Sequence, residues 1–343
     1  FPVSVFKEMG KLGLMGVLVP EKYGGSGLSY FEYKTIIEEI AKVCGSIGLS
    51  LAAHNSLCTG HILTFANEEQ KKKYLPKLAT GEWVGCFGLT EPDYGSDPLS
   101  MITNIKEEGD HVILNGAKMW ISNSPLADIA VVWAKDEQGE IVGLIVERGM
   151  AGFTTPTIHD KWSLRASATG ELVFDHVRVP KQNILPNIKG LKGPLSCLSK
   201  ARYGIAWGAL GAAMDCYYTA LKYSQERIQF GKPIGAFQLQ QKKLAEMITE
   251  ITKAQLMVWR IGVLMNEGRA TPQQISMAKR NSCEMAANIV RDARQVLGGM
   301  GITGEFSIMR HMMNLESVIT YEGTHDIHLL ITGMDITGFN AFK

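Results

Sequence analysis

The stretch WVGCFGL, residues 83–89, is where the pattern of the chain changes from helical to strand-like. Before it, apolar residues recur at near-helical spacing, as in Val5–Leu14 and Tyr33–Val43, and Asn67 precedes two glutamates in the manner of a helix N-cap. From this stretch to residue 180, β-branched and aromatic residues are enriched between turn signals, which is typical of strands. The stretch therefore marks the start of a β segment.

The β segment is predicted to form an all-β module. Its expected strands are Trp83–Leu89, His111–Leu114, Ile129–Trp133, Ile141–Val146 and Leu172–Val179. Turns are expected at Asn115-Gly116 and Gln138-Gly139, and the first pair is a hairpin signal because Gly accepts the positive φ that tight turns need.

After Pro194 the pattern returns to long helices, which favours a helix bundle. The helices expected there are Tyr203–Arg227, Gln238–Asn266, Thr271–Leu297 and Asp326–Ile336. We therefore predict an α+β multidomain fold of three parts. Residues 1–81 form a helical domain whose first helix is expected to be missing, residues 82–187 a β-domain, and residues 188–343 a helical bundle.

The composition is that of an ordinary soluble globular protein, with 343 residues, 45% of them hydrophobic and 20% charged. A net charge of +1 argues against a surface built for nucleic acid. No run of 18 or more apolar residues is present, so the sequence predicts no membrane span. The six cysteines are scattered without metal-binding spacing, which predicts free thiols in a reducing compartment and no metal site.

The stretch YEGTHD, residues 321–326, places a carboxylate, Glu322, beside a glycine. Gly lets the backbone approach a ligand closely, and Thr324 is an N-cap residue type before an apolar run, so we expect a tight turn that opens a final helix. For an isolated motif of this kind, a solvated glutamate on a capped surface helix is the commoner explanation.

Two stretches of the β segment could bind a phosphate or a planar group. LTEPDYGSD, residues 89–97, combines hydroxyls with a Pro and a Gly turn, and KMWISNS, residues 118–124, ends in an aromatic side chain and hydroxyls. Taken alone, the first is equally a decorated β-turn, and the second an ordinary strand with a core Trp.

Later stretches are ambiguous by themselves. In RIQFGKPI, residues 227–234, Arg227 suits a pyrophosphate, although a helix C-terminus attracts a cation without any ligand. Residues 299–304 match GxGxxG, but that motif must follow a strand and a helix is expected here, so we reject a Rossmann motif and expect a Gly-rich helix end and turn. For His54 and His61, a core or surface role is a simpler explanation than catalysis.

Taken together, LTEPDYGSD, KMWISNS, RIQFGKPI and YEGTHD resemble the acyl-CoA dehydrogenase family in content and order. The resemblance covers essentially the whole chain. SLRASATG (163–170), ARYGIAWG (201–208) and YEGTHDIH (321–328) look most like its glutaryl-CoA dehydrogenase branch. The family's fold is an N-terminal helical domain, a central β-barrel-like domain and a C-terminal four-helix bundle, which agrees with the order expected from the patterns.

The resemblance implies bound FAD, contacted by Phe87, Leu89, Thr90, Gly95, Ser96, Trp120, Ile121, Ser122, Thr324 and Phe342. It implies that the FAD of a neighbouring subunit is contacted by Arg227, Gln229, Phe230, Gln238, Gln295, Val296, Leu297, Gly298 and Gly299. The implied substrate residues are Ser96, Arg202, Gly323, Tyr321 and Gly48, and Glu322 falls on the family's catalytic base. An acyl-CoA substrate, an electron-transferring flavoprotein as acceptor and a homotetramer built from dimers are implied as well.

The resemblance leaves the acyl chain open. Some relatives carry the base at the position of Ala201, which has no carboxylate, so Glu322 is the expected base. Glutaryl-CoA dehydrogenases bind the distal carboxylate with an arginine where this chain has Gly48, and a linked glutamate falls on Ala41. No arginine precedes Arg148, although His54 or Lys42 could stand in for it.

We therefore expect α,β-dehydrogenation of a short, branched or cyclic acyl-CoA without a distal carboxylate. The alternatives are a decarboxylating glutaryl-CoA dehydrogenase and, in another class, a flavin- and acyl-CoA-binding scaffold without activity. The expected location is the cytoplasm in a bacterium and the mitochondrial matrix in a eukaryote.

Overall fold

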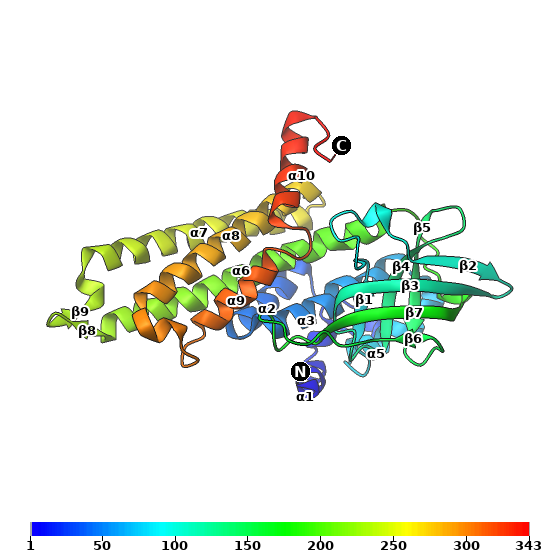
Figure 1. Cartoon of the computed structure of the whole chain (residues 1–343), viewed down its shortest axis with the longest axis horizontal. Helices are drawn as coiled ribbons and strands as arrows, with labels where there is room; N and C mark the ends of the chain where they lie inside the picture. The colour runs from blue at the N-terminus through cyan, green and yellow to red at the C-terminus, as the bar shows by residue number, and fades with distance from the viewer. Residues whose placement is uncertain (1, 343) are drawn as a thin grey trace. The chain divides into compact units, whose positions relative to one another are not determined.

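The computed structural model describes residues 2–342. Backbone contacts divide the chain into two compact units. The β unit comprises the chain up to Tyr33 together with Leu49–Lys161 and Arg165–Ala201. The helical unit comprises Lys34–Gly48, Trp162–Leu164 and the chain from Arg202 onward. Figure 1 shows the sheet of the first unit and the long helices of the second.

Seven strands of the described chain form one sheet in the β unit. They are β1 (Gly85–Gly88), β2 (Asn104–Glu108), β3 (His111–Ser122), β4 (Ile129–Lys135), β5 (Ile141–Glu147), β6 (Phe153–Thr154) and β7 (Thr169–Pro180). The order is β1-β4-β2-β3-β7-β6, with β5 paired to β4. Strand β1 runs parallel to β4, whereas β3 pairs antiparallel with both β2 and β7.

Strand β4 is apolar along its length because both faces of the sheet are buried there. Successive side chains of a strand point to opposite faces. Those of Ile129, Val131 and Trp133 join one buried cluster, and those of Ala130, Val132 and Ala134 join a second. The alternation explains why the sequence of this strand is a continuous apolar run.

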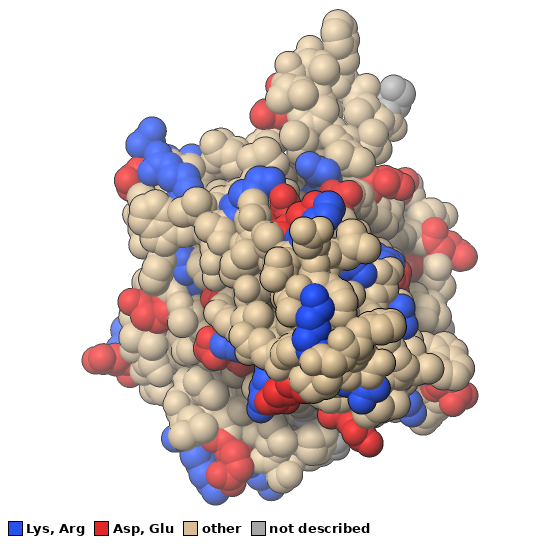
Figure 2. All heavy atoms as spheres, turned by 90° about the vertical axis from the view of Figure 1, so that its left-hand side faces the viewer, with Lys and Arg blue, Asp and Glu red and all other residues tan. Residues whose placement is uncertain are grey.

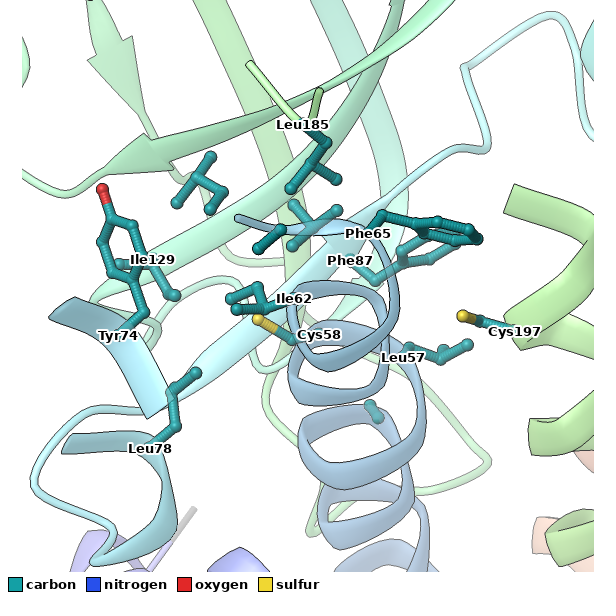
Figure 3. Close-up of a cluster of buried hydrophobic side chains, with 14 of the residues drawn as sticks. Leu57, Cys58, Ile62, Phe65, Tyr74, Leu78, Phe87, Ile129, Leu185 and Cys197 are labelled. Atoms are coloured by element: carbon teal, nitrogen blue, oxygen red, sulfur yellow. The ribbon is translucent and has the colours of Figure 1, made fainter. Parts of the chain in front are cut away.

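Helical segments contribute side chains to the first cluster, among them η2 (Glu21–Tyr23), the π-helical η3 (Ala53–Thr59), α4 (Gly60–Phe65) and α5 (Glu68–Ala79). The segments α1 (Val3–Lys11) and η1 (Leu14–Gly16) precede them in the chain. Figure 3 shows Leu57, Cys58 and Ile62 beside Phe87 and Ile129 of the sheet. Two further 3₁₀ turns, η4 (Pro98–Ser100) and η5 (Lys181–Asn183), complete this unit.

The helical unit is built on long helices. They are α7 (Gln238–Asn266), α8 (Pro272–Val296), α9 (Ile308–Val318), α10 (His325–Thr337) and the part of α6 (Lys192–Glu226) from Arg202 onward, with parts of α2 (Tyr30–Val43) and α3 (Gly45–Ala52). Between α6 and α7 lie the short strands β8 (Ile228–Gln229) and β9 (Lys232–Pro233) and the turn η6 (Ile234–Ala236), and η7 (Gly298–Ile302) follows α8.

Polar side chains tie these helices together. The buried Lys34 Nζ of α2 donates to the hydroxyl of Tyr203 in α6, at 2.7 Å, and that hydroxyl donates to the carbonyl of Val258 in α7, at 2.9 Å. On α6, Asp215 accepts hydrogen bonds from Ser307 and from His311 of α9. Such contacts satisfy buried polar groups and fix the helices relative to one another within the unit.

The expected order of helical, β and helical segments is confirmed, as are the N-cap at Asn67 and the turn at Gln138-Gly139 between β4 and β5. Residues 299–304 follow a helix, which confirms that this GxGxxG sequence is a Gly-rich helix end and not the strand-to-helix turn of a Rossmann motif. The strands β2 and β6 were not expected. The helix α6 begins at Lys192 rather than at the expected Tyr203.

The hairpin expected at Asn115-Gly116 is wrong. Both residues lie inside β3, at a register shift in its pairing with β7, and the β2–β3 turn falls at Gly109-Asp110. Gly116 has φ 136°, and a Cβ there would lie 2.5 Å from Thr103 Oγ1. The glycine therefore serves a bulge with close backbone approach, a role that the same residue type allows.

Within residues 2–342, no helix is both long and apolar enough to cross a membrane. The six cysteines are free thiols, five of them buried, as the scattered spacing predicted.

Gly85 of β1 gives a test of how tightly the sheet packs on η3. A Cβ at Gly85 would lie 2.4 Å from Cys58 Sγ and 2.8 Å from Cys58 Cβ. We expect Gly85→Ala to destabilise the protein by about 1–3 kcal/mol through overpacking, seen as a lower thermal midpoint. Gly304→Ala is the control, because a Cβ on the exposed Gly304 would have no neighbour within 4 Å. Equal midpoints for the two variants would contradict the packing described.

Candidate active site

Glu322 lies in the turn between α9 and α10 of the helical unit. Its φ is 55° and that of Gly323 is 92°, so two successive residues adopt the left-handed region. For a glutamate this conformation costs roughly 1–3 kcal/mol and persists only where the surroundings fix it. Thr324 then caps α10 by accepting a hydrogen bond from the backbone N–H of Ile327, at 3.2 Å, which confirms the expected turn and N-cap.

Two buried cations hold this turn by its carbonyl groups. Arg202 Nε of α6 donates to the carbonyl oxygen of Glu322, at 2.8 Å. Lys279 Nζ of α8 donates to the carbonyl oxygens of Tyr321 and Gly323, both at 3.0 Å. Three consecutive carbonyls are thus bound by charged donors, which form stronger hydrogen bonds than neutral donors do.

The carboxylate of Glu322 is left free by this arrangement. Within residues 2–342 no cation lies within ion-pair distance of it, and its buried Oε2 accepts no hydrogen bond. Burial raises the pKa of Glu322 to about 7, although the nearby Arg202 and Lys279 charges act in the opposite direction. A carboxylate in this state can take up a proton near neutral pH.

The backbone N–H of Glu322 is also free, because no acceptor among the described residues takes it. A carbonyl-type oxygen placed at this N–H would receive a hydrogen bond beside the carboxylate. The turn therefore presents one proton acceptor and one preorganised donor side by side, as required for enolate chemistry.

His328 of α10 packs against the same turn. It is fully buried, and a Cβ on Gly323 would lie 2.9 Å from its Nε2. Burial, with the nearby Lys279 and Arg202 charges, lowers the pKa of His328 to about 3, so this ring is neutral. Gly323 is needed both for its positive φ and for this close approach.

Gly48 of α3 lies against small residues. A Cβ on Gly48 would lie 3.3 Å from that of Ala41, and a Cβ on Gly208 would lie 3.6 Å from the same atom. These positions in α2, α3 and α6 carry no charge, so the chain places no cation at Gly48 itself.

In the β unit, the stretches 89–97 and 118–122 are joined to each other. The N–H of Met119 donates to the carbonyl of Thr90, at 2.9 Å, where the pairing of β3 with β7 shifts register between Lys118 and Ile121. At this bulge Trp120 has φ 63° and is 57% exposed. Bulges of this kind re-aim side chains near functional sites, and here the bulge turns a large aromatic ring outward.

A buried ion pair underlies the same two stretches. Lys118 Nζ donates to Glu91 Oε1, at 2.8 Å, and to the carbonyl of Leu89, at 3.2 Å. The N–H groups of Ile102 and Thr103 also donate to the Glu91 carboxylate. Burial lowers the pKa of Lys118 to about 8. Burial acts to raise the pKa of Glu91, but the hydrogen bonds that Glu91 accepts outweigh this effect and hold the pKa of Glu91 below its usual range.

The other expected residues of the β unit differ in exposure. Phe87 is buried with its ring stacked on that of His61, the ring centroids 4.7 Å apart, and Leu89 is buried too. Gly95 and Ser96 are exposed in the turn, and a Cβ on Gly95 would have no neighbour within 4 Å. Ile121 is buried and Ser122 half-buried at the end of β3.

A second set of expected residues lies around β8, β9 and the neighbouring ends of α7 and α8, and Figure 2 faces the end of the helical unit that carries β8 and β9. Arg227, Gln229 and Phe230 lie exposed in the segment between α6 and β9, and Gln238 starts α7. Gln295 of α8 accepts from Lys243 of α7, at 2.9 Å, which brings the two helix ends together. Val296 and Leu297 are buried, whereas Gly298 and Gly299 are exposed. Phe342, beyond α10, is 48% exposed.

The sequence analysis missed Lys279, His328 and the pairing of Glu91 with Lys118. Lys279 stands on the buried face of α8, four residues from both Ile275 and Cys283. A charge within an apolar stripe is the signal that could have identified it. The partners of the ion pair are far apart in the chain, so no local pattern joins them.

Comparisons with known proteins agree on one family. Models of the N-terminal, middle and C-terminal domains of acyl-CoA dehydrogenase match residues 1–82, 86–177 and 189–337. A solved glutaryl-CoA dehydrogenase from Mycobacterium smegmatis is 47% identical, with a TM-score of 0.98 over 100% of this chain and 88% of that chain. A second structure of a glutaryl-CoA dehydrogenase from that organism, in complex with FADH2, is 45% identical, with the same TM-score and coverage.

Other relatives act on different acyl groups. The butyryl-CoA dehydrogenase of Megasphaera elsdenii is 36% identical, with a TM-score of 0.93 over 97% of this chain and 89% of that chain. The mitochondrial isovaleryl-CoA dehydrogenase of Pongo abelii is 37% identical over 98% of this chain and 80% of that protein.

The Glu91–Lys118 pair gives a test of the β unit. We expect Glu91→Gln and Lys118→Met each to destabilise the protein by about 3–5 kcal/mol, because each leaves a buried charge unpaired. The double variant should lose less than the sum of the single variants, measured by thermal midpoint and Trp fluorescence. Glu108→Gln is the control, since it breaks an exposed ion pair with Arg178. Single variants as mild as this control would refute the role given to the pair.

Proposed function

The chain belongs to the acyl-CoA dehydrogenase family, and we propose that it oxidises an uncharged acyl-CoA between Cα and Cβ, with Glu322 as the base. Members of this family are flavin-dependent oxidoreductases, and FAD is the cofactor of this enzyme. The observation that carries the proposal is the free carboxylate of Glu322 in a turn held through its carbonyls.

The β unit fits a flavin. Trp120 offers an exposed planar surface on a strained backbone, and its stretch is hydrogen-bonded through Met119 to the stretch that carries the exposed Gly95 and Ser96. The residues of this unit that would hold FAD are those named from the resemblance, between Phe87 and Ser122. When bound, FAD supplies the redox chemistry by accepting the β-hydride of the substrate.

The chain's own residues handle the proton. Glu322 removes the α-proton of the thioester, and its free backbone N–H donates to the thioester oxygen as negative charge develops there. A pKa of about 7 makes the carboxylate both available and basic at neutral pH, whereas an ordinary glutamate would be a weaker base. Arg202, Tyr321 and Gly323 shape the turn, and Ser96 is proposed as a further substrate contact.

The resemblance places an arginine of the glutaryl-CoA dehydrogenases at the position of Gly48, and its absence from this position supports an uncharged acyl chain. The first arginine of the sequence is Arg148, and Gly48 packs on Ala41. A carboxylate buried there would lack a partner, which is costly. Decarboxylation of glutaryl-CoA is the second candidate, favoured by the 47% identity to the Mycobacterium smegmatis enzyme and by the stretches around Arg202 and Tyr321.

We further propose a homotetramer and an electron-transferring flavoprotein as acceptor. Leu256 and Trp259 on α7 are 61% and 51% exposed, large apolar side chains that a second copy would cover. Arg227, Gln238 and the segment 295–299 then serve the FAD of a neighbouring subunit. The boundaries 1–81, 82–187 and 188–343 remain our domain proposal, and the location is the bacterial cytoplasm or the mitochondrial matrix.

Replacing the base tests the reaction. We expect Glu322→Gln to retain FAD but to slow bleaching of the flavin by substrate by about 10²–10⁴-fold, because proton abstraction is lost. The measurement is anaerobic stopped-flow absorbance with butyryl-CoA and isovaleryl-CoA. Bleaching at the wild-type rate would eliminate Glu322 as the base. No bleaching by any acyl-CoA in the wild-type protein would favour a scaffold.

A substrate panel tests the acyl group. We expect kcat/KM for the best of butyryl-CoA, isovaleryl-CoA and a cyclic acyl-CoA to exceed that for glutaryl-CoA by roughly 100-fold or more, since an unpaired carboxylate is disfavoured. The assay uses an artificial electron acceptor, with CO2 release followed in parallel. Efficient glutaryl-CoA turnover with CO2 release would establish the decarboxylating alternative instead.

A further inference from the structure

Lys279 is a buried cation without an acidic partner among the described residues. It lies in the middle of α8 with 1% of its surface exposed, and no carboxylate there is within ion-pair distance of its Nζ. Buried charges are normally paired. What Lys279 binds instead is backbone, through the carbonyls of Tyr321 and Gly323 on either side of Glu322.

We propose that Lys279 is the positioning residue of the catalytic turn: by binding the carbonyls on both sides of Glu322, it fixes the carboxylate in place without pairing with it. The inference rests on the proposed role of Glu322 as base. It assigns to α8 a part in the reaction that neither the cofactor nor the substrate residues supply.

The geometry explains why two cations are needed. Arg202 binds the central carbonyl, at 2.8 Å, and Lys279 binds the two flanking ones, so the left-handed backbone at Glu322 and Gly323 is fixed from α6 and α8 together. A cation paired directly with the carboxylate would depress its basicity. Donation to carbonyls gives order to the turn while the carboxylate stays free to accept the α-proton.

The charges that face Glu322 are few. Arg202 on α6 and Lys279 on α8 act on its titration, whereas Cys283, one turn along α8, is a neutral thiol because burial raises its pKa to about 11. Burial likewise raises the pKa of Tyr321 well above its usual range, and His328 of α10 is neutral. Glu284 of α8 lies 3.8 Å from His325, which heads α10. Loss of the Lys279 charge should therefore raise the pKa of Glu322, because among these groups only Arg202 still lowers it.

Two substitutions separate the hydrogen bonds from the charge. Lys279→Gln keeps a donor and removes the charge, whereas Lys279→Met removes both. Without the charge, protonated Glu322 is favoured, so its pKa rises. Because the base acts when deprotonated, the acid limb of kcat/KM should move to higher pH in both variants. Lys279→Met should in addition slow flavin reduction at high pH by roughly 10- to 100-fold, since the carboxylate is misplaced.

The experiment follows flavin bleaching and kcat/KM from pH 5.5 to 9, about the pH range that spans this titration, with FAD content and circular dichroism to establish folding. Arg269→Met is the matched control, because it removes one positive charge from an exposed pair with Glu267 in the same unit. This control should keep the wild-type limb and rate.

An acid limb that stays at its wild-type position in folded Lys279→Gln overturns the proposal, even if Lys279→Met fails to fold. So does a wild-type rate of flavin reduction in folded Lys279→Met. Failure of the proposed function is distinguishable, since it appears as normal bleaching in Glu322→Gln, whatever the Lys279 variants do.

Discussion

Charged donors bound to three consecutive carbonyls are the interaction on which the rest of this site depends. Arg202 and Lys279 come from different helices and bind the backbone of residues 321–323 rather than the side chain of Glu322. The carboxylate takes no part in holding the turn and keeps an unpartnered oxygen, and burial raises the pKa of Glu322. The hydrogen bonds to the carbonyl groups order the turn, and the Glu322 carboxylate stays available to accept a proton. A base that also served as an anchor could not have both properties.

The β unit uses a buried charge in a related way. Glu91 and Lys118 join the turn 89–97 to β3, and they form hydrogen bonds with each other and with backbone groups of the β unit. The groups left for a ligand are the exposed Trp120 ring and the open turn at Gly95. In each unit, hydrogen bonds from buried cations fix a loop, while the side chains that we propose to contact cofactor or substrate take no part in these bonds. Preorganisation of this kind is what catalysis requires of a scaffold.

Much of the fold followed from local pattern, because local physics decides those features. Asn67 caps its helix, β4 is apolar on both faces, and Thr324 opens α10. Glu322 could be predicted as a candidate base from the sequence because a carboxylate beside a glycine lies within a set of family motifs. The role proposed for Lys279 could not be predicted from the sequence, because a lysine in a helix is ordinarily solvated and only tertiary contacts bury this one. Asn115-Gly116 misled because glycine serves a bulge as well as a hairpin.

Because the Glu322 carboxylate is buried without a partner, it should titrate near neutrality. Infrared difference spectra of the wild-type holoenzyme, with Glu322→Gln subtracted as the spectral reference, measure this directly across a pH series. We expect a single carboxyl group that loses its proton with a midpoint near 7. A midpoint at the ordinary glutamate value of 4.5 would contradict it, because such a carboxylate must be either solvated or paired.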